Sequence, residues 1–206
     1  MKMAPYSTHQ ALLVSALAAT RGDIMEIGAG WYSTPLVSSF SVLQERCAYT
    51  VETGEFVYAL MKPLATERHA ILLIDGYNFD RIGKFKAAPG QGIQHYVIRQ
   101  REFLEELWTR CRGERAESNP SYRLSVVFID QAPGFLRVPA IEFFADKADF
   151  IITHDTEHVG HYHYEPTLSS FKHRWDFRLH KPNSVIVSNF RDCSCFEFLD
   201  PHSRPE

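Results

Sequence analysis

Five acidic side chains stand at the carboxyl ends of five predicted strands, which is the edge where an open parallel sheet binds its ligand. These residues are Glu26, Glu52, Asp75, Asp130 and Asp155. Each acid taken alone could cap a helix or lie in a solvated loop. Acids after five successive strands, however, are more than chance placement would give. We therefore expect a ligand site built around these carboxylates.

The first of these acids is followed by a glycine turn, Gly28, Ala29 and Gly30. Glycine has no Cβ, so the backbone of this turn can approach a ligand closely. A dinucleotide fingerprint would need a third glycine where Ser33 stands, and Glu26 would repel a pyrophosphate. The turn therefore predicts a ligand that carries positive charge, rather than NAD or NADP.

Glu52 follows the second predicted strand, 22 residues after Gly30. A carboxylate at this position can accept hydrogen bonds from both hydroxyls of a ribose. Together with the acidic glycine turn, it predicts that the ligand is a cation containing adenosine.

The segment 153–165 leaves the last predicted parallel strand and is rich in ionisable groups. It holds His154, Asp155, His158, His161 and His163. A neutral imidazole, with a reference pKa of about 6.5, can take a proton from a hydroxyl or an amine. We expect His154, Asp155 and His158 to be catalytic. Two alternatives stay open: the histidines could bind zinc, iron or nickel, or the loop could be a polar segment packed by its tyrosines.

A parallel sheet would bring these residues together, and the chain has the pattern of one. Short, nearly all-apolar runs alternate with segments of helical spacing, as a sheet covered by helices on both faces requires. The predicted strands span residues 23–27, 47–51, 69–74, 125–129 and 149–153, and a hairpin follows at 173–180 and 184–190. The predicted helices span residues 10–19, 55–66, 93–112 and 138–147, with another beginning at 33–35. We expect one α/β domain over residues 1–206, with a doubly wound, mostly parallel seven-stranded sheet and an antiparallel C-terminal hairpin.

Four motifs, MEIGAG at 25–30, YTVET around Glu52, LLIDG around Asp75 and VVFIDQAPG around Asp130, resemble those of class I S-adenosylmethionine-dependent methyltransferases. The resemblance covers about residues 8–160, and the segments YSTHQALLVSAL, GWYSTPLV and THDTEH are similar to a bacterial group of small methyltransferase-like proteins. It implies a Rossmann-like methyltransferase fold with S-adenosyl-L-methionine as cofactor. The chain departs from the family pattern at Trp31 and Tyr32, which replace a small residue and could wall or narrow the cofactor pocket.

The resemblance also implies a role for each motif residue. Glu26 and the glycine turn Gly28–Gly30 would flank the methionine part of the cofactor, and Glu52 would hold its ribose. Asp75 and Gly76 would lie near the adenine, with Tyr77, and Asp130 near the amino group of the cofactor.

Asp130 and Asp155 resemble, in addition, the two carboxylates by which some O-methyltransferases hold magnesium. The amide that usually accompanies them is replaced here by Thr156. A divalent metal ion held by Asp130 and Asp155 is therefore a second cofactor expected from the resemblance.

The composition limits the class of partner. The formal net charge of −3 leaves no broad basic field for a nucleic acid, and no apolar stretch is long enough to cross a bilayer. The four cysteines are too few and scattered for a disulfide framework, which favours free thiols in the cytoplasm. We expect an enzyme acting on a small-molecule methyl acceptor, and the alternative is a non-catalytic module that binds the same cofactor. A homodimer is left open.

Overall fold

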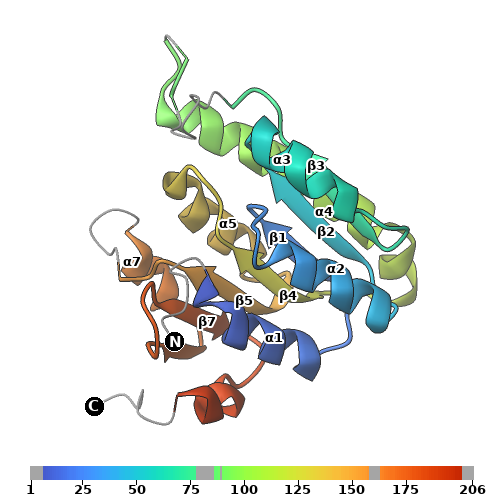
Figure 1. Cartoon of the computed structure of the whole chain (residues 1–206), viewed down its shortest axis with the longest axis vertical. Coiled ribbons are helices and arrows are strands. Elements are labelled where there is room, and N and C mark those ends of the chain that lie inside the picture. Colours follow the sequence, from blue (N-terminus) through green and yellow to red (C-terminus); the bar gives the residue numbers. More distant parts are fainter. Residues whose placement is uncertain (1–6, 78–85, 89, 158–162, 201–206) are drawn as a thin grey trace.

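Seven strands form one twisted sheet at the centre of the computed structural model, which describes residues 7–77, 86–88, 90–157 and 163–200 (Figure 1). Their order across the sheet is β3-β2-β1-β4-β5-β7-β6. The strands are β1 (Ile24–Ile27), β2 (Ala48–Glu52), β3 (His69–Leu73), β4 (Leu124–Ile129), β5 (Ala148–His154), β6 (His173–Phe177) and β7 (Ser184–Ser188). The first five strands pair in parallel, while β7 is antiparallel to both β5 and β6. The predicted doubly wound sheet with an antiparallel hairpin is confirmed.

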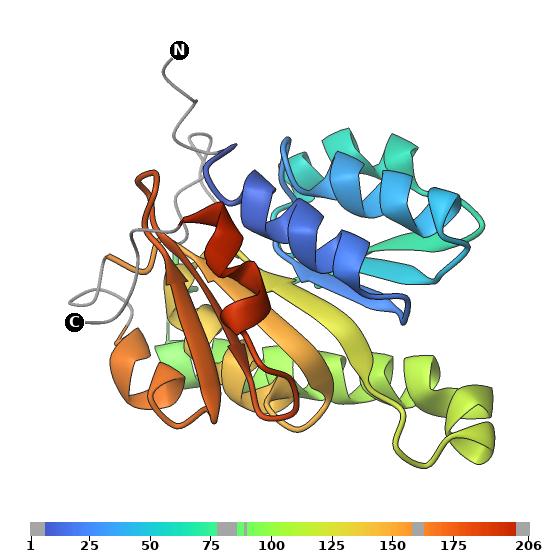
Figure 2. The ribbon, with the colours of Figure 1, turned by 90° about the horizontal axis from the view of Figure 1, so that it is seen from below.

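Helices cover both faces of the sheet (Figure 2). On one face lie α1 (Gln10–Ala19), α2 (Thr34–Leu43) and α3 (Glu55–Met61), followed by a 3-10 helix at Ser194–Leu199. On the other face lie α4 (Ile93–Ser118), α5 (Arg137–Phe144) and α7 (Tyr164–Leu168). Each face therefore has its own hydrophobic core.

The central strand β4 is buried along its whole length, and Ser125 is its one polar residue. Side chains alternate between the two faces of a strand. Val126 and Phe128 enter the core beneath α1, whereas Val127 and Ile129 enter the core beneath α4 and α5. Because both faces are buried, the strand is mostly apolar, and the hydroxyl of Ser125 is satisfied by donating to the carbonyl of Asp23 at 3.1 Å.

The predicted element bounds differ from the observed ones in three helices. The helix predicted at 55–66 ends at Met61 and continues as a 3-10 helix, Lys62–Leu64, because Pro63 has no N–H to donate. The helix predicted to end near 112 continues to Ser118 across Gly113, whose φ and ψ of 3° and −119° interrupt it. The helix predicted at 138–147 starts one residue earlier and ends at Phe144.

Two further expectations can be compared with the structure. All four cysteines are free thiols, as predicted. Among the described residues, no helix combines the length and the apolar character needed to span a membrane. The predicted loop at 78–92 lies mostly outside the described residues.

Candidate functional site

The carboxyl ends of β2, β1, β4 and β5 lie side by side, since these strands are neighbours in the sheet. The glycine turn follows β1 and packs directly on the end of β4. Gly28 has a φ of +95°, and a Cβ built on it would lie 2.4 Å from Cα of Gln131. Only glycine can occupy this position, because both the backbone conformation and the space exclude a side chain.

The carboxyl group of Glu26 lies behind the glycine turn and supports it. Its Oε2 accepts hydrogen bonds from the hydroxyls of Thr50 at 2.6 Å and Thr34 at 2.9 Å. Thr34 Oγ1 in turn accepts the N–H of Gly30 at 2.9 Å. Burial raises the pKa of Glu26 to about 7. The structure thus places Glu26 beneath the turn, with no exposed surface.

Glu52 holds the same turn from the side of β2. Its Oε2 accepts the N–H of Ala29 at 2.8 Å, and its Oε1 accepts those of Thr53 at 2.8 Å and Gly54 at 2.7 Å. Burial raises the pKa of Glu52, and these three N–H groups offset part of that effect. The carboxylate is therefore fixed in orientation at the end of β2.

Asp75 and Gly76 lie at the far end of this edge, after β3. Asp75 is highly exposed and pairs with Arg99 of α4 at 3.2 Å. Gly76 has a φ of +85°, and a Cβ on it would lie 2.8 Å from the guanidinium carbon of Arg99. The hydroxyl of the next residue, Tyr77, donates to the carbonyl of Tyr96 at 2.8 Å. These residues are separated from Asp130 by β2 and β1.

The structure brings three of the predicted site residues together, Asp130, Asp155 and His154. Arg137 contacts both carboxylates. Arg137 Nη2 lies 2.9 Å from Asp130 Oδ1, and its Nη1 lies 3.0 Å from Asp155 Oδ2. On the other side, His154 Nδ1 lies 3.2 Å from Asp130 Oδ2 and 3.6 Å from Asp155 Oδ1. A guanidinium thus bridges the two carboxylates for which magnesium was expected.

The charges of this cluster stabilise one another. Burial alone would raise the pKa of Asp130, but His154 and Arg137 outweigh it and leave the pKa lowered. Burial alone would lower the pKa of His154, but its hydrogen bond to Asp130 outweighs that effect and leaves the pKa raised. The ion-paired form of His154 and Asp130 is therefore favoured in the folded protein.

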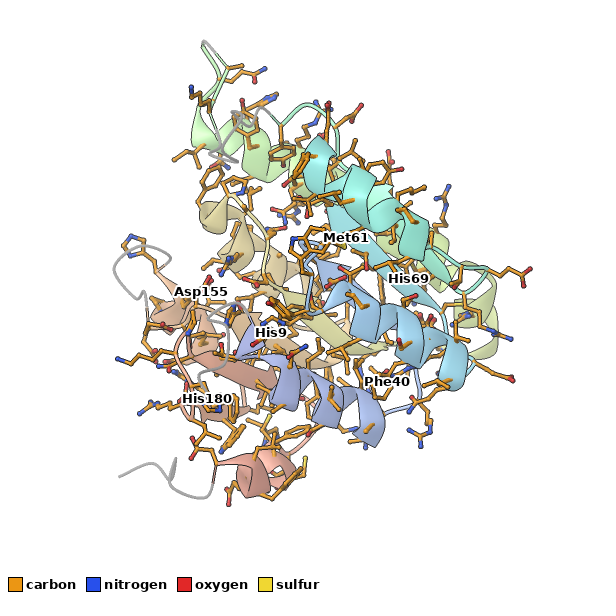
Figure 3. The ribbon with its side chains drawn as sticks, viewed as in Figure 1. His9, Phe40, Met61, His69, Asp155 and His180 are labelled. Carbon is orange, nitrogen blue, oxygen red and sulfur yellow. The ribbon has the colours of Figure 1, made fainter. Side chains whose placement is uncertain are left out.

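His9, at the N-terminal end of α1, is a neighbour of this cluster that the sequence patterns did not indicate (Figure 3). Its ring packs 4.7 Å from that of Phe128 and edge-on at 4.8 Å from that of His154. Its side chain is buried, and neither ring nitrogen has a hydrogen-bond partner in the described part of the chain. Burial and the neighbouring His154 lower the pKa of His9 to about 4, so the ring is neutral near pH 7.

The remaining site expectations concern the segment after β5 and the aromatic residues of the glycine turn. His158 and His161 lie outside the described residues, so their predicted roles stay predictions. His163 is exposed and has a φ of 52° just before α7. Trp31 is also exposed, at 66% of its surface.

Solved structures share this architecture. A protein described as a putative O-methyltransferase, from Klebsiella pneumoniae, matches 92% of this chain and 82% of its own, at 13% identity and a TM-score of 0.55. The O-methyltransferase from Bacillus cereus in complex with S-adenosylhomocysteine matches 91% and 82%, at 13% identity and a TM-score of 0.50. Human methyltransferase 10 domain containing protein matches 91% and 83%, at 8% identity and a TM-score of 0.50.

These matches, with the strand order, show that the chain has the fold of class I S-adenosylmethionine-dependent methyltransferases. The resemblance of its motifs to that class therefore extends to the complete architecture. Comparison with protein-family models gave no match, and comparison with curated proteins gave no significant match.

Proposed function

We propose that this protein binds S-adenosyl-L-methionine and transfers its methyl group to a hydroxyl or amine of a small molecule. The observation that carries the proposal is that the backbone N–H groups of the glycine turn are already hydrogen-bonded within the protein. All three of its N–H groups are already used: Gly28 donates to Val51 O, Ala29 to Glu52 and Gly30 to Thr34. A turn without free N–H groups cannot cradle a pyrophosphate, which needs those donors.

The same turn suits a cofactor that carries positive charge. The absence of a side chain at Gly30 leaves room for close approach, and Glu52 and Asp130 supply negative charge at the two sides of the turn. Glu52 Oε2 accepts one N–H in the structure, so a lone pair remains for a ribose hydroxyl. These features fit S-adenosyl-L-methionine better than NAD or NADP.

When bound, S-adenosyl-L-methionine supplies an electrophilic methyl group on a sulfonium. The residues of this chain would hold the acceptor in line with that group and remove the proton that the acceptor loses. We assign proton removal to the catalytic set His154, Asp155 and His158. His154 must be neutral to accept a proton, and its raised pKa means that activity should increase as the pH rises above 6.5.

An alternative is a non-catalytic module that uses the same pocket to sense or bind the cofactor. The ion pairs around Arg137 favour the enzyme, because several charged groups are held at the edge where the acceptor would lie. The absence of a broad basic field supports a small-molecule acceptor over a nucleic acid. A cytoplasmic location stays a prediction from composition.

Isothermal titration calorimetry with S-adenosylhomocysteine and with NAD tests the cofactor. We expect binding of the first alone. Glu52→Ala should weaken it at least about tenfold, because a charge-assisted hydrogen bond of about 1.5–3 kcal/mol to the ribose is lost. Glu55→Ala, an exposed acid three residues away, is the matched control. Equal binding of NAD, or unchanged affinity in Glu52→Ala, would contradict the assignment.

Turnover is tested separately by following S-adenosylhomocysteine release with panels of hydroxyl and amine acceptors and with RNA. Release with a small-molecule acceptor supports the proposal. Release with RNA alone would contradict the acceptor class. Cofactor binding without release on any panel would favour the non-catalytic module.

A further inference from the structure

Three donor atoms converge at the edge of the sheet, next to the glycine turn, and a fourth lies beside one of them. The ligand atoms of His9, Asp130 and His154 all lie within 4.8 Å of one another. Asp155 Oδ1 lies 3.6 Å from His154 Nδ1 and adds a fourth donor. These residues come from the start of α1 and from the ends of β4 and β5. Segments far apart in the sequence thus contribute to one cluster.

Arg137 determines which carboxylate oxygens remain for a ligand. It binds Asp130 Oδ1 and Asp155 Oδ2, so Asp130 Oδ2 and Asp155 Oδ1 are the oxygens that turn toward His154. The guanidinium orients both carboxylates as a second-shell partner does in a metal site.

The hydrogen bonds of His154 leave Nδ1 as its ligand atom. Thr8 Oγ1 donates its only proton to the carbonyl of Pro182 at 2.7 Å. It therefore accepts from His154 Nε2 at 2.9 Å, which assigns a proton to that nitrogen. Metal-binding histidines are commonly fixed in this way by a hydrogen bond from the other ring nitrogen.

His9 is the observation that points to a ligand. Its residue surface is only 2% exposed, and its two ring nitrogens lack partners in the described part of the chain. Buried polar atoms are normally paired, so this histidine needs a partner that the described part of the chain does not provide. A metal ion beside His154 would be such a partner.

We propose that His9, Asp130 and His154, with Asp155 as a fourth ligand, bind a divalent transition-metal ion such as Zn²⁺. Two imidazoles with carboxylates suit zinc or iron, whereas magnesium prefers oxygen ligands alone. In a tetrahedral site with bonds of about 2.0–2.1 Å, ligand atoms lie about 3.3 Å apart. The distances of 3.2 and 3.6 Å from His154 Nδ1 to the two carboxylates match this spacing. Closure of the site requires a small movement of His9.

The ion can reach the site from solvent through its carboxylates. The side chains of Asp130 and Asp155 are 25% and 22% exposed, whereas the two imidazoles lie behind them. An ion on Nδ1 would prevent His154 from accepting a proton, so proton removal by His154 applies to the metal-free protein. Metal binding itself can be measured without cofactor or methyl transfer.

The test is calorimetric titration of chelator-treated, untagged protein with Zn²⁺ and with Mg²⁺, together with the visible absorption spectrum of the Co²⁺ form. We expect one tight Zn²⁺ site, no comparable Mg²⁺ site, and a Co²⁺ spectrum of low coordination number. Thr8→Val should weaken Zn²⁺ binding about 10- to 100-fold, as loss of a second-shell partner does. Asp130→Asn and His9→Phe remove ligands and should weaken it more.

We expect the His9→Phe variant to stay folded, so its Zn²⁺ affinity can be compared with that of the wild type. Phenylalanine preserves the ring packing against Phe128 and removes the two unpaired nitrogens, so the metal-free melting temperature should be equal or higher. The matched controls are His95→Ala, an exposed histidine of α4, and a variant with His158, His161 and His163 all changed to Ala. Both should bind Zn²⁺ like the wild type. Unchanged affinity in His9→Phe, loss in the triple variant, or equal binding of Mg²⁺ would overturn the proposal.

Discussion

Replacement of Gly28 by alanine tests how closely the glycine turn packs on β4. The new Cβ would lie 2.4 Å from Cα and 2.5 Å from N of Gln131, and both are backbone atoms that cannot rotate away. The φ of +95° adds strain for any residue with a Cβ, about 1–2 kcal/mol. Overpacking adds about 1–3 kcal/mol. We therefore expect Gly28→Ala to lower the free energy of unfolding by about 2–5 kcal/mol, combining these two costs.

Gly30→Ala is the matched control from the same turn. Its Cβ would meet only the rotatable hydroxyl of Ser33 at 3.0 Å, and its φ lies outside the strained region. Its cost should stay below about 1 kcal/mol. Urea denaturation followed by far-UV circular dichroism measures both variants. In a chain of this length each kcal/mol lowers the melting temperature by about 2–4 °C. If Gly28→Ala costs no more than Gly30→Ala, the turn does not pack on β4 as described.

Three further predictions concern charge. Burial raises the pKa of Glu26 from 4.5 to about 7, so the free energy of unfolding falls as the pH rises through this interval, by about 3 kcal/mol at 1.4 kcal/mol per pKa unit. Glu26→Gln should flatten that pH dependence in urea titrations at pH 5 and pH 8. An unchanged difference between the two pH values would contradict the prediction. The pKa of His154 is raised, so its ion pair with Asp130 contributes below pH 6.5 and is lost as the pH rises through the folded-state pKa. His154→Gln should therefore cost about 3 kcal/mol at pH 6 and less at pH 9, and an equal loss at both would refute the pairing. Asp75→Asn should change stability by less than about 1 kcal/mol, because its pair with Arg99 is solvent-exposed, and thermal unfolding checks this.

The sheet could be predicted from the sequence because its strands are buried on both faces. Five of the six residues in Leu124–Ile129 are apolar for that reason, and apolar residues also form the larger part of each of the other four parallel strands. The first helix was predicted with its observed bounds, Gln10–Ala19. The end of α4 was not, because Gly113 interrupts the helix without ending it.

The candidate site was predictable only in part, because its members come from distant elements. Asp130 and His154 were found from their positions after strands, and the structure brings them together. Arg137 and His9 have no such signal: the first opens α5 and the second precedes α1, and only the fold moves them beside the strand ends. The choice of carboxylate oxygens that Arg137 binds depends on side-chain geometry, which no spacing in the sequence encodes.

The saturated N–H groups of the glycine turn affect how fast and how tightly a ligand can bind. Since Glu26, Thr34 and Glu52 already hold the turn in one shape, binding does not have to order this part of the backbone. The entropic cost of association is reduced by that preorganisation, and the association rate is not limited by rearrangement of the turn. The turn formed by Gly28, Ala29 and Gly30 is in this sense rigid before any ligand arrives.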